Sequence, residues 1–426
     1  MGEPSAVTTT EPTKKASAGE SFRHPLPQEL LRRDDPFMPP AALVAMAERR
    51  PVTKSTMDTG DPFWLVSGYD EARAVLSDPR FSSDRFSHHP RFKALPEHVR
   101  EQMRAKGQAG SFINMDPPEH SRYRKLLTGQ FTVRRMRELS ARIEEIVGER
   151  LDAMLANGTT ADLITEFAFP VPSLVICELL GVPYEDRAEF QLRAANLLRM
   201  NVPVNEALEN VDALREFLQR LIDDKRKNAC DDMLSGLVHA ETDPALTDDE
   251  LVNIAMLLLL AGYETSANML GLGTFLLLQR PEQLAALRDD PSRTGDAVDE
   301  LLRYLSILHV GLFRFAKEDL ELGGEQIPAS GTVVVSLVAA NRDGQHWTDP
   351  EVLDVTRTRV PHLAFGHGVH QCLGQQLARI ELTIAYTALL RRLPNLRLAV
   401  PPQEIPLRDD MITYGVYTLP VAWDAP

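Results

Sequence analysis

A helix signal near the middle of the chain limits the possible folds more than any other feature. Thr247 and Glu250 form a capping box, and no proline follows until Pro281. At 1.5 Å per residue, a helix of about 30 residues is about 45 Å long, which is the width of a whole domain. Residues 254–260 are apolar on nearly all sides. We therefore expect this helix to be buried at the centre of one large domain.

The composition is that of a globular protein without a nucleic-acid partner. The 426 residues carry a net charge of −15, and hydrophobic residues make up 43%. The longest apolar run, Ile254–Ala261, is far shorter than the roughly 20 residues that span a bilayer. Residues 1–22 lack the apolar stretch of a secretory signal. We expect a disordered tail at 1–22, one domain at 23–426, no membrane association and a cytoplasmic location.

The remaining pattern predicts a mainly α fold with small β-sheets, in the α+β class. Apolar residues at helical spacing predict helices at 39–49, 134–155, 164–180, 184–199, 205–227, 296–305 and about 372–393. Short strands are predicted at 51–56, 62–67, 312–315, 325–328 and 332–337. Residues 86–110 have no clear period, which predicts a long loop.

A cysteine lies at the predicted start of the last helix, behind a loop rich in glycine. Of the three cysteines, Cys177 has the setting of a small buried apolar side chain, whereas Cys372 lies within the glycine-rich run Phe365–Gly374. The N–H groups and the positive end of a helix lower the pKa of a nearby thiol. An odd, sparse cysteine count fits a reducing compartment. The sequence therefore predicts a thiolate ligand or nucleophile at Cys372.

The run Phe365–Gly374 resembles the haem-binding signature of the cytochrome P450 monooxygenases, F-G-x-G-x-H-x-C-x-G. The resemblance implies one large cytochrome P450 fold that binds haem b. It also implies that the Cys372 thiolate is the axial iron ligand, whose electron donation favours cleavage of the O–O bond. Phe365 would lie close to the haem and shield the sulfur.

A second segment, Ala261–Ser266, resembles the oxygen-activating motif A-G-x-E/D-T of the same family. A threonine in the middle of a helix more often only bonds to a carbonyl one turn earlier. The resemblance implies that the glycine and threonine open the helix locally to make room for dioxygen. It also implies that Glu264 and Thr265 deliver protons.

Glu300 and Arg303, one helical turn apart, match the family's E-x-x-R. Such pairs are usually weak surface ion pairs. The resemblance implies instead a structural pair, completed by a third residue downstream, for which the stretch Ala340–Asp343 is the match.

Four further residues match the partners of the two haem propionates. His120 and Arg124 lie in a segment that resembles the family's propionate-binding helix, and Arg314 and His362 match the two other partners. Taken singly, an Arg or His in a strand or loop is more often a surface residue.

The resemblance is closest to the bacterial, actinobacterial type of the family. It implies hydroxylation of a bulky, largely apolar secondary metabolite, such as a macrolide, terpenoid or sterol. The partners would be O2, ferredoxin and a ferredoxin reductase that uses NAD(P)H. Epoxidation, desaturation or oxidative coupling remain alternatives within the fold. A haem sensor or electron carrier is the alternative from another class, although neither needs Glu264 and Thr265. A cysteine hydrolase lacks a supporting His and Asn or Asp context.

By family position, four apolar residues would contact the substrate: Leu257, Leu260, Ala261 and Leu312. Plain core packing is the alternative. We expect a mobile lid from the loop 86–110 and the joint 199–203. We also expect ferredoxin to dock on the basic residues between His120 and Arg137, which are Arg122, Arg124, Lys125, Arg134, Arg135 and Arg137.

Overall fold

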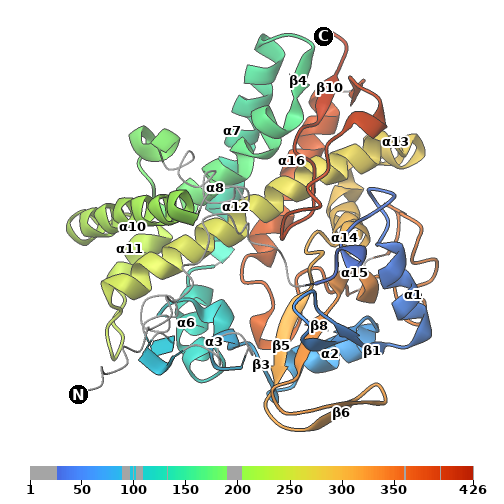
Figure 1. The fold of residues 1–426 in the computed structure, drawn as a ribbon. Helices are drawn as coiled ribbons and strands as arrows, with labels where there is room; N and C mark the ends of the chain where they lie inside the picture. Colours follow the sequence, from blue (N-terminus) through green and yellow to red (C-terminus); the bar gives the residue numbers. More distant parts are fainter. Residues whose placement is uncertain are drawn as a thin grey trace, which may run out of the picture.

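The computed structural model describes residues 26–88, 96–98, 100–101, 109–131, 133–189, 204–358, 361–393 and 395–425. The helices (Figure 1) are α1 (Ala41–Arg49), α2 (Tyr69–Ser77), α3 (Arg85–His88), α6 (Glu119–Thr128), α7 (Val133–Ala156), α8 (Pro170–Leu180), α10 (Val204–Lys227), α11 (Met233–Val238), α12 (Asp248–Leu278), α13 (Pro281–Asp289), α14 (Thr294–Leu305), α15 (Leu337–Ala340) and α16 (Gln375–Arg392). The strands are β1 (Val52–Thr56), β2 (Pro62–Val66), β3 (Phe81–Ser82), β4 (Thr160–Asp162), β5 (Leu312–Ala316), β6 (Leu320–Leu322), β7 (Glu325–Ile327), β8 (Thr332–Val335), β9 (Arg397–Leu398) and β10 (Pro420–Ala422). The predicted mainly α class with small sheets is confirmed.

The central helix α12 crosses the whole molecule (Figure 1) and packs against α8, α10, α14 and α16. It has 31 residues, and both hydrogen bonds of the Thr247–Glu250 capping box are present. By length and composition α12 could cross a bilayer, but most of its apolar window is buried inside the protein. Its apolar residues therefore form the core around which the other helices pack.

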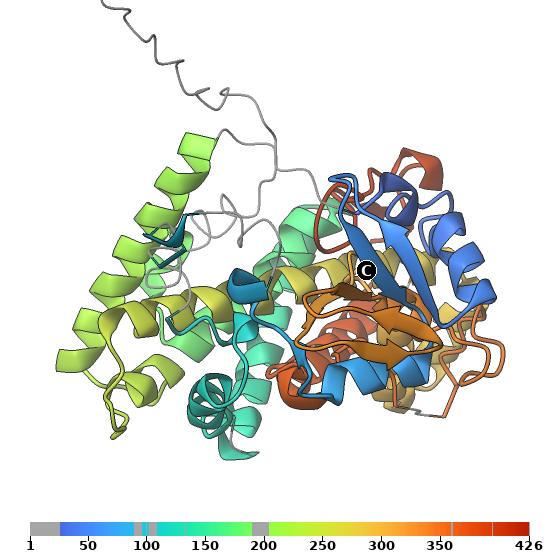
Figure 2. The same ribbon diagram turned by 60° about the horizontal axis from the view of Figure 1, so that its bottom comes forward.

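The largest sheet has five strands in the order β1-β2-β8-β5-β3, in which only β2 and β8 are parallel. Figure 2 shows this sheet at one end of the molecule, with α10 and α11 at the opposite end. A three-stranded sheet, β4-β10-β9, and the hairpin β6-β7 complete the β structure. The pairing of β5 with β8 fixes the position of Arg314, opposite Val333.

Three predicted elements differ from the observed ones. The last helix begins at Gln375 rather than Cys372, because the Cys372 N–H donates backwards to the carbonyl of Phe365. The predicted helix 164–180 is split into a π-helical turn and α8, which begins at Pro170, a residue suited to a first helical position. The strand predicted at 332–337 ends at Val335, where the Ser336 side chain caps α15. Beyond residue 189, the helix predicted at 184–199 lies outside the described residues.

Candidate active site

The loop before α16, residues 365–374, which we call the Cys loop, is folded so that Cys372 lies just ahead of the helix. The Cys372 N–H donates to the carbonyl of Phe365 at 2.8 Å. Gly366 and Gly368 both have positive φ angles, 69° and 71°, which favour glycine. A β-carbon at Gly368 would also collide with the carbonyl oxygen of Leu76 on α2. The glycines therefore let the loop turn tightly while it packs on α2.

The environment of the Cys372 sulfur combines burial with positive charge. Burial raises the pKa of the Cys372 thiol, whereas a hydrogen bond from the Gly374 backbone and the charges of Arg124 and Arg379 lower it. No group of three or more His, Cys, Asp or Glu side chains gathers as a metal site in the described part of the chain. A metal held at Cys372 would therefore have this sulfur as its one ligand from such side chains within the described residues.

Four side chains that can carry positive charge converge beside the Cys loop: His120, Arg124, Arg314 and His370. The rings of His120 and His370 have centroids 4.2 Å apart. His120 is buried, and neither of its ring nitrogens has a hydrogen-bond partner among the described residues. Burial, followed by the charges of Arg314 and His120, lowers the pKa of His370 to about 3. We call these four residues the cationic cluster.

Within the described residues, one carboxylate, Asp116, acts on the charges of the cationic cluster. Burial lowers the pKa of Arg314 to about 10, and its guanidinium donates to the carbonyl of the adjacent Phe313. Within the described residues, Arg124 forms no ion pair. The nearby Asp116 carboxylate is already engaged by Ser82, by the backbone N–H of Ser83 and by Lys317.

Arg314 is buried and Arg124 half-buried, and burial lowers the pKa of both guanidinium groups. A buried charge is costly without a partner, so the two arginines suit a ligand with carboxylates, to which the two histidines can donate hydrogen bonds. Together with a cysteine at its edge, this donor set fits haem, which has an iron and two propionates.

His362 does not belong to the cationic cluster. Its Nε2 lies 3.1 Å from the Asp299 carboxylate, and its Nδ1 accepts the backbone N–H of Ala364 at 3.1 Å. Both ring nitrogens are thus used within the protein, which does not support the expected role of His362 toward a propionate. His370 is the histidine that the sequence reasoning missed, although it is the His of the F-G-x-G-x-H-x-C-x-G signature.

Glu264 and Thr265 lie on adjacent positions of α12 but have different surroundings. The Thr265 hydroxyl donates to the carbonyl of Ala261 at 2.7 Å, and its side chain is half-exposed. Glu264 is buried, and Arg408 donates to its carboxylate at 2.5 Å. Burial raises the pKa of Glu264, while Arg408 and Thr413 lower it. The Arg408 pair was not foreseen, because Arg408 is far away in the sequence.

The helix is not interrupted at the predicted oxygen site. The α-helix is continuous from Asp248 to Leu278, so the local opening expected at Gly262 and Thr265 is absent. A β-carbon at Gly262 would lie 2.8 Å from the Cδ1 atom of Ile176 on α8. Glycine at this position therefore serves the close approach of α8.

Glu300 and Arg303 form a bidentate pair at 2.7 and 2.8 Å. Arg303 also donates to the backbone carbonyls of Asn341 and Pro350, so the pair holds the segment that precedes the Cys loop. The third member is Arg357, whose Nε donates to Glu300 at 3.2 Å. The expectation of a third member in Ala340–Asp343 is wrong, because Arg342 pairs with Glu351 instead.

Part of α12 is open rather than buried. Leu257 and Leu260 are half-exposed and Ala261 is exposed, although the neighbouring Ile254 and Leu259 are fully buried. An apolar open stretch in the middle of a core helix is suited to contact with an apolar ligand. Leu312 is also half-exposed, and its Cδ1 lies 3.7 Å from the position of a β-carbon on Gly366, next to the Cys loop.

The structure describes only part of the predicted lid, whereas it describes the predicted basic patch. Most of the expected lid, within 86–110 and 199–203, lies outside the described residues. Within the predicted basic patch, Arg134 and Arg135 both donate to Asp231 at 2.9 Å, and Arg122 pairs with Glu250. Lys125 and Arg137 are exposed and have no ion pair within the described residues.

Comparison with known proteins gives consistent matches over nearly the whole chain. The model of the family described as Cytochrome P450 matches residues 43–416. Cytochrome P450 105C1 of Streptomyces sp is 51% identical over 92% of this chain and 97% of that protein. The vitamin D3 dihydroxylase of Streptomyces griseolus is 44% identical over 88% and 91%. The crystal structure of Rif16 in complex with R-L has a TM-score of 0.85 and 68% identity, covering 93% of this chain and 100% of that one.

Proposed function

This chain belongs to the cytochrome P450 family, and from that premise we propose that it hydroxylates a bulky, largely apolar small molecule with electrons from ferredoxin. The family makes the enzyme a monooxygenase with a haem held by a cysteine thiolate. The observation that carries the proposal is the position of Cys372 beside the cationic cluster: His370 precedes it by two residues in the same loop, and the His370 ring lies 4.2 Å from that of His120.

In this proposal Cys372 holds the haem iron, and Phe365 shields the sulfur. His120, Arg124, Arg314 and His370 bind the propionates. When bound, the haem supplies the chemistry that activates dioxygen and inserts one oxygen atom into a C–H bond. The protein half-buries Cys372, which limits access of water to the sulfur.

Proton delivery is assigned to Thr265 and Glu264. Thr265 Oγ1 donates its proton to the Ala261 carbonyl but still has lone pairs to accept a hydrogen bond from a water. Glu264 is the nearest acid along α12, and its Oε1 atom is held by Arg408. The carboxyl group therefore has to leave Arg408, or use its other oxygen, to pass a proton toward Thr265.

The substrate class is inferred from the open stretch of α12. Leu257, Leu260 and Ala261 carry no charge, and apolar walls with few polar groups favour an apolar ligand. The relative named vitamin D3 dihydroxylase acts, by its name, on such a molecule. A secondary metabolite, such as a macrolide, terpenoid or sterol, fits these walls. Leu312 would contact the haem edge or a substrate beside it. Epoxidation, desaturation or coupling would use the same walls.

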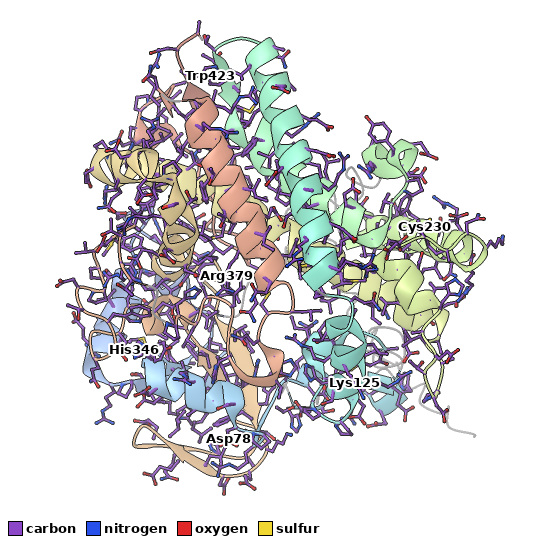
Figure 3. All side chains as sticks on the ribbon, turned by 180° about the vertical axis from the view of Figure 1, so that it is seen from behind. Asp78, Lys125, Cys230, His346, Arg379 and Trp423 are labelled. Atoms are coloured by element: carbon purple, nitrogen blue, oxygen red, sulfur yellow. The ribbon has the colours of Figure 1, made fainter. Side chains whose placement is uncertain are left out.

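Ferredoxin, reduced by a ferredoxin reductase in the cytoplasm, is the proposed electron donor. Figure 3 shows Lys125 on the same face of the molecule as Arg379, which follows the Cys loop at the start of α16. Lys125 and Arg137 are the exposed cations of the predicted patch without ion pairs among the described residues, so they are free to attract an acidic partner.

Spectroscopy of the ferrous carbon-monoxide complex tests the proposal. The wild-type protein should show the red-shifted Soret band of thiolate-ligated haem, and Cys372→Ser should lose it, because a serine oxygen is a harder and weaker donor. Cys177→Ser and Cys230→Ser are the matched controls and should keep the band. A Cys372→Ser protein with an unchanged band would overturn the assignment. Formation of an oxidised product distinguishes the monooxygenase from a haem sensor or electron carrier, because neither of these would form one.

A further inference from the structure

An arginine that the sequence reasoning did not single out lies against the ring that shields the thiolate. Arg379, on the first turn and a half of α16 (Figure 3), places its guanidinium carbon 4.5 Å from the centroid of the Phe365 ring. The Phe365 carbonyl in turn accepts the Cys372 N–H at 2.8 Å. One residue, Phe365, therefore joins a fixed positive charge to the backbone of the proposed iron ligand.

The guanidinium of Arg379 is held in place from two other sides. Its Nε donates to the Asp299 carboxylate at 2.7 Å, and its Nη1 donates to the Gln375 side chain at 3.1 Å. The Arg379 side chain is only 19% exposed and that of Asp299 only 5% exposed. Solvent therefore screens the charge of Arg379 less than that of an ordinary surface arginine.

Asp299 also fixes the segment just before the Cys loop. The same Oδ1 atom that accepts from Arg379 lies 3.1 Å from His362 Nε2, and His362 accepts the Ala364 N–H. Asp299 is the residue before Glu300 in the middle of α14, so one helix holds both the E-x-x-R pair and this clamp. We call Asp299, His362 and Arg379 the loop clamp.

We propose that the loop clamp sets the reduction potential of the haem iron, with Arg379 raising it and Asp299 lowering it. The inference rests on the proposed function, because it takes Cys372 as the iron ligand. Arg379 acts through the thiolate and Phe365, so it is a positioning and electrostatic residue rather than a catalytic one.

The sign of each effect follows from charge. Reduction of ferric to ferrous iron adds one negative charge to the site, and a nearby cation stabilises the more negative state. A cation near the sulfur also weakens electron donation to the iron, which favours the ferrous form. The Asp299 carboxylate opposes both effects because it partly neutralises Arg379.

The experiment measures the midpoint potential of the substrate-free holoenzyme by spectroelectrochemical titration. Arg379→Gln should shift the midpoint downward, so that at the wild-type midpoint the ferrous-to-ferric ratio falls by about tenfold. Asp299→Asn is nearly isosteric and should shift the midpoint upward. Arg379→Lys, which keeps the charge, should stay close to wild type.

The matched control is Arg392→Gln. Arg392 is on the same helix, thirteen residues further on and so about 20 Å away, where it pairs with Asp152. This change removes the same charge from α16 and should leave the midpoint where it is.

Opposite shifts in Arg379→Gln and Asp299→Asn distinguish the proposal from a purely structural role. If the clamp only kept the loop rigid, both changes would loosen Phe365 and shift the midpoint in the same direction, and that result would overturn the inference. If Arg379→Gln does not fold, the upward shift in Asp299→Asn decides alone. Loss of the thiolate band in the wild-type carbon-monoxide spectrum would instead mean that the proposed function has failed.

Discussion

The hydroxyl of Thr265 donates to a carbonyl of its own helix and bonds to no other helix or strand among the described residues. We therefore expect its removal to affect proton delivery more than stability. Thr265→Ala removes one half-exposed hydroxyl and should leave substrate binding unchanged. We expect product formed per NAD(P)H consumed to fall by about tenfold, with the missing electrons recovered as hydrogen peroxide. Thr274→Ala is the control, because Thr274 makes the same bond to the Leu270 carbonyl but is buried further along α12. Equal coupling in both variants would contradict the role of Thr265.

The two histidines of the Cys loop region provide a second test at this scale. His370 lies against His120 in the cationic cluster, whereas His362 is bound to Asp299. A hydrogen bond to a charged group contributes about 1.5–3 kcal/mol, so His370→Ala should speed haem transfer to apomyoglobin by at least about tenfold. His362→Ala should have the smaller effect. The reverse ranking would return the propionate role to His362.

At the scale of elements, α12 and α16 pack at a distance that only glycine permits. The Tyr386 hydroxyl of α16 donates to the Met269 carbonyl at 2.5 Å, and a β-carbon at Gly273 would collide with that hydroxyl. Gly273→Ala should therefore lower the free energy of unfolding by about 1–3 kcal/mol.

Gly148→Ala is the matched control for Gly273→Ala. Gly148 is also inside a helix, α7, but a β-carbon there meets nothing within 4 Å. The substitution should raise the free energy of unfolding by about 1 kcal/mol, because alanine is the better helix former. Thermal unfolding followed by circular dichroism checks both signs, and destabilisation by both changes alike would contradict the packing argument.

A buried acid on α16 makes stability depend on pH. Burial raises the pKa of Glu381 from 4.5 to about 8, and its Oε1 has no hydrogen-bond partner in the described part of the chain. Because the folded-state pKa is the higher one, the neutral carboxyl stabilises the fold at low pH. This contribution is lost progressively as the pH rises from the unfolded pKa through the folded pKa. Glu381→Gln should therefore flatten the decline of the unfolding midpoint between about pH 5 and 8. An unchanged slope would show that Glu381 is not the group responsible.

The parts of the site that could be predicted from the sequence are those whose residues are close together in the chain. The Cys loop, the pair Glu264 and Thr265, and the pair Glu300 and Arg303 are each contained in a few residues. Arg357 and Arg408 could not be placed, because their partners lie 57 and 144 residues away. The start of the last helix was also missed, since it depends on a backward hydrogen bond within the loop and not on any pattern of apolar residues.

At the scale of the whole molecule, the net charge of −15 repels an acidic partner. Docking of such a partner therefore depends on local cations on one face. We expect the double change Lys125→Glu and Arg137→Glu to slow reduction by ferredoxin by about tenfold at low ionic strength, with a smaller effect in high salt. Reduction by dithionite should not change. Arg134→Glu should have the smaller effect, because Arg134 is already paired with Asp231. Ferredoxin rates that are insensitive to salt and to these changes would place the docking site elsewhere.

The cationic cluster also affects the steady-state abundance of the protein in a cell. If haem propionates pair with Arg124 and Arg314, as proposed, cofactor binding and folding are linked by mass action. When translation outpaces haem biosynthesis, the surplus chains stay in the less stable form, and proteases degrade chains in proportion to how often they open. The steady-state abundance of this protein should therefore follow the haem supply rather than the rate of its synthesis.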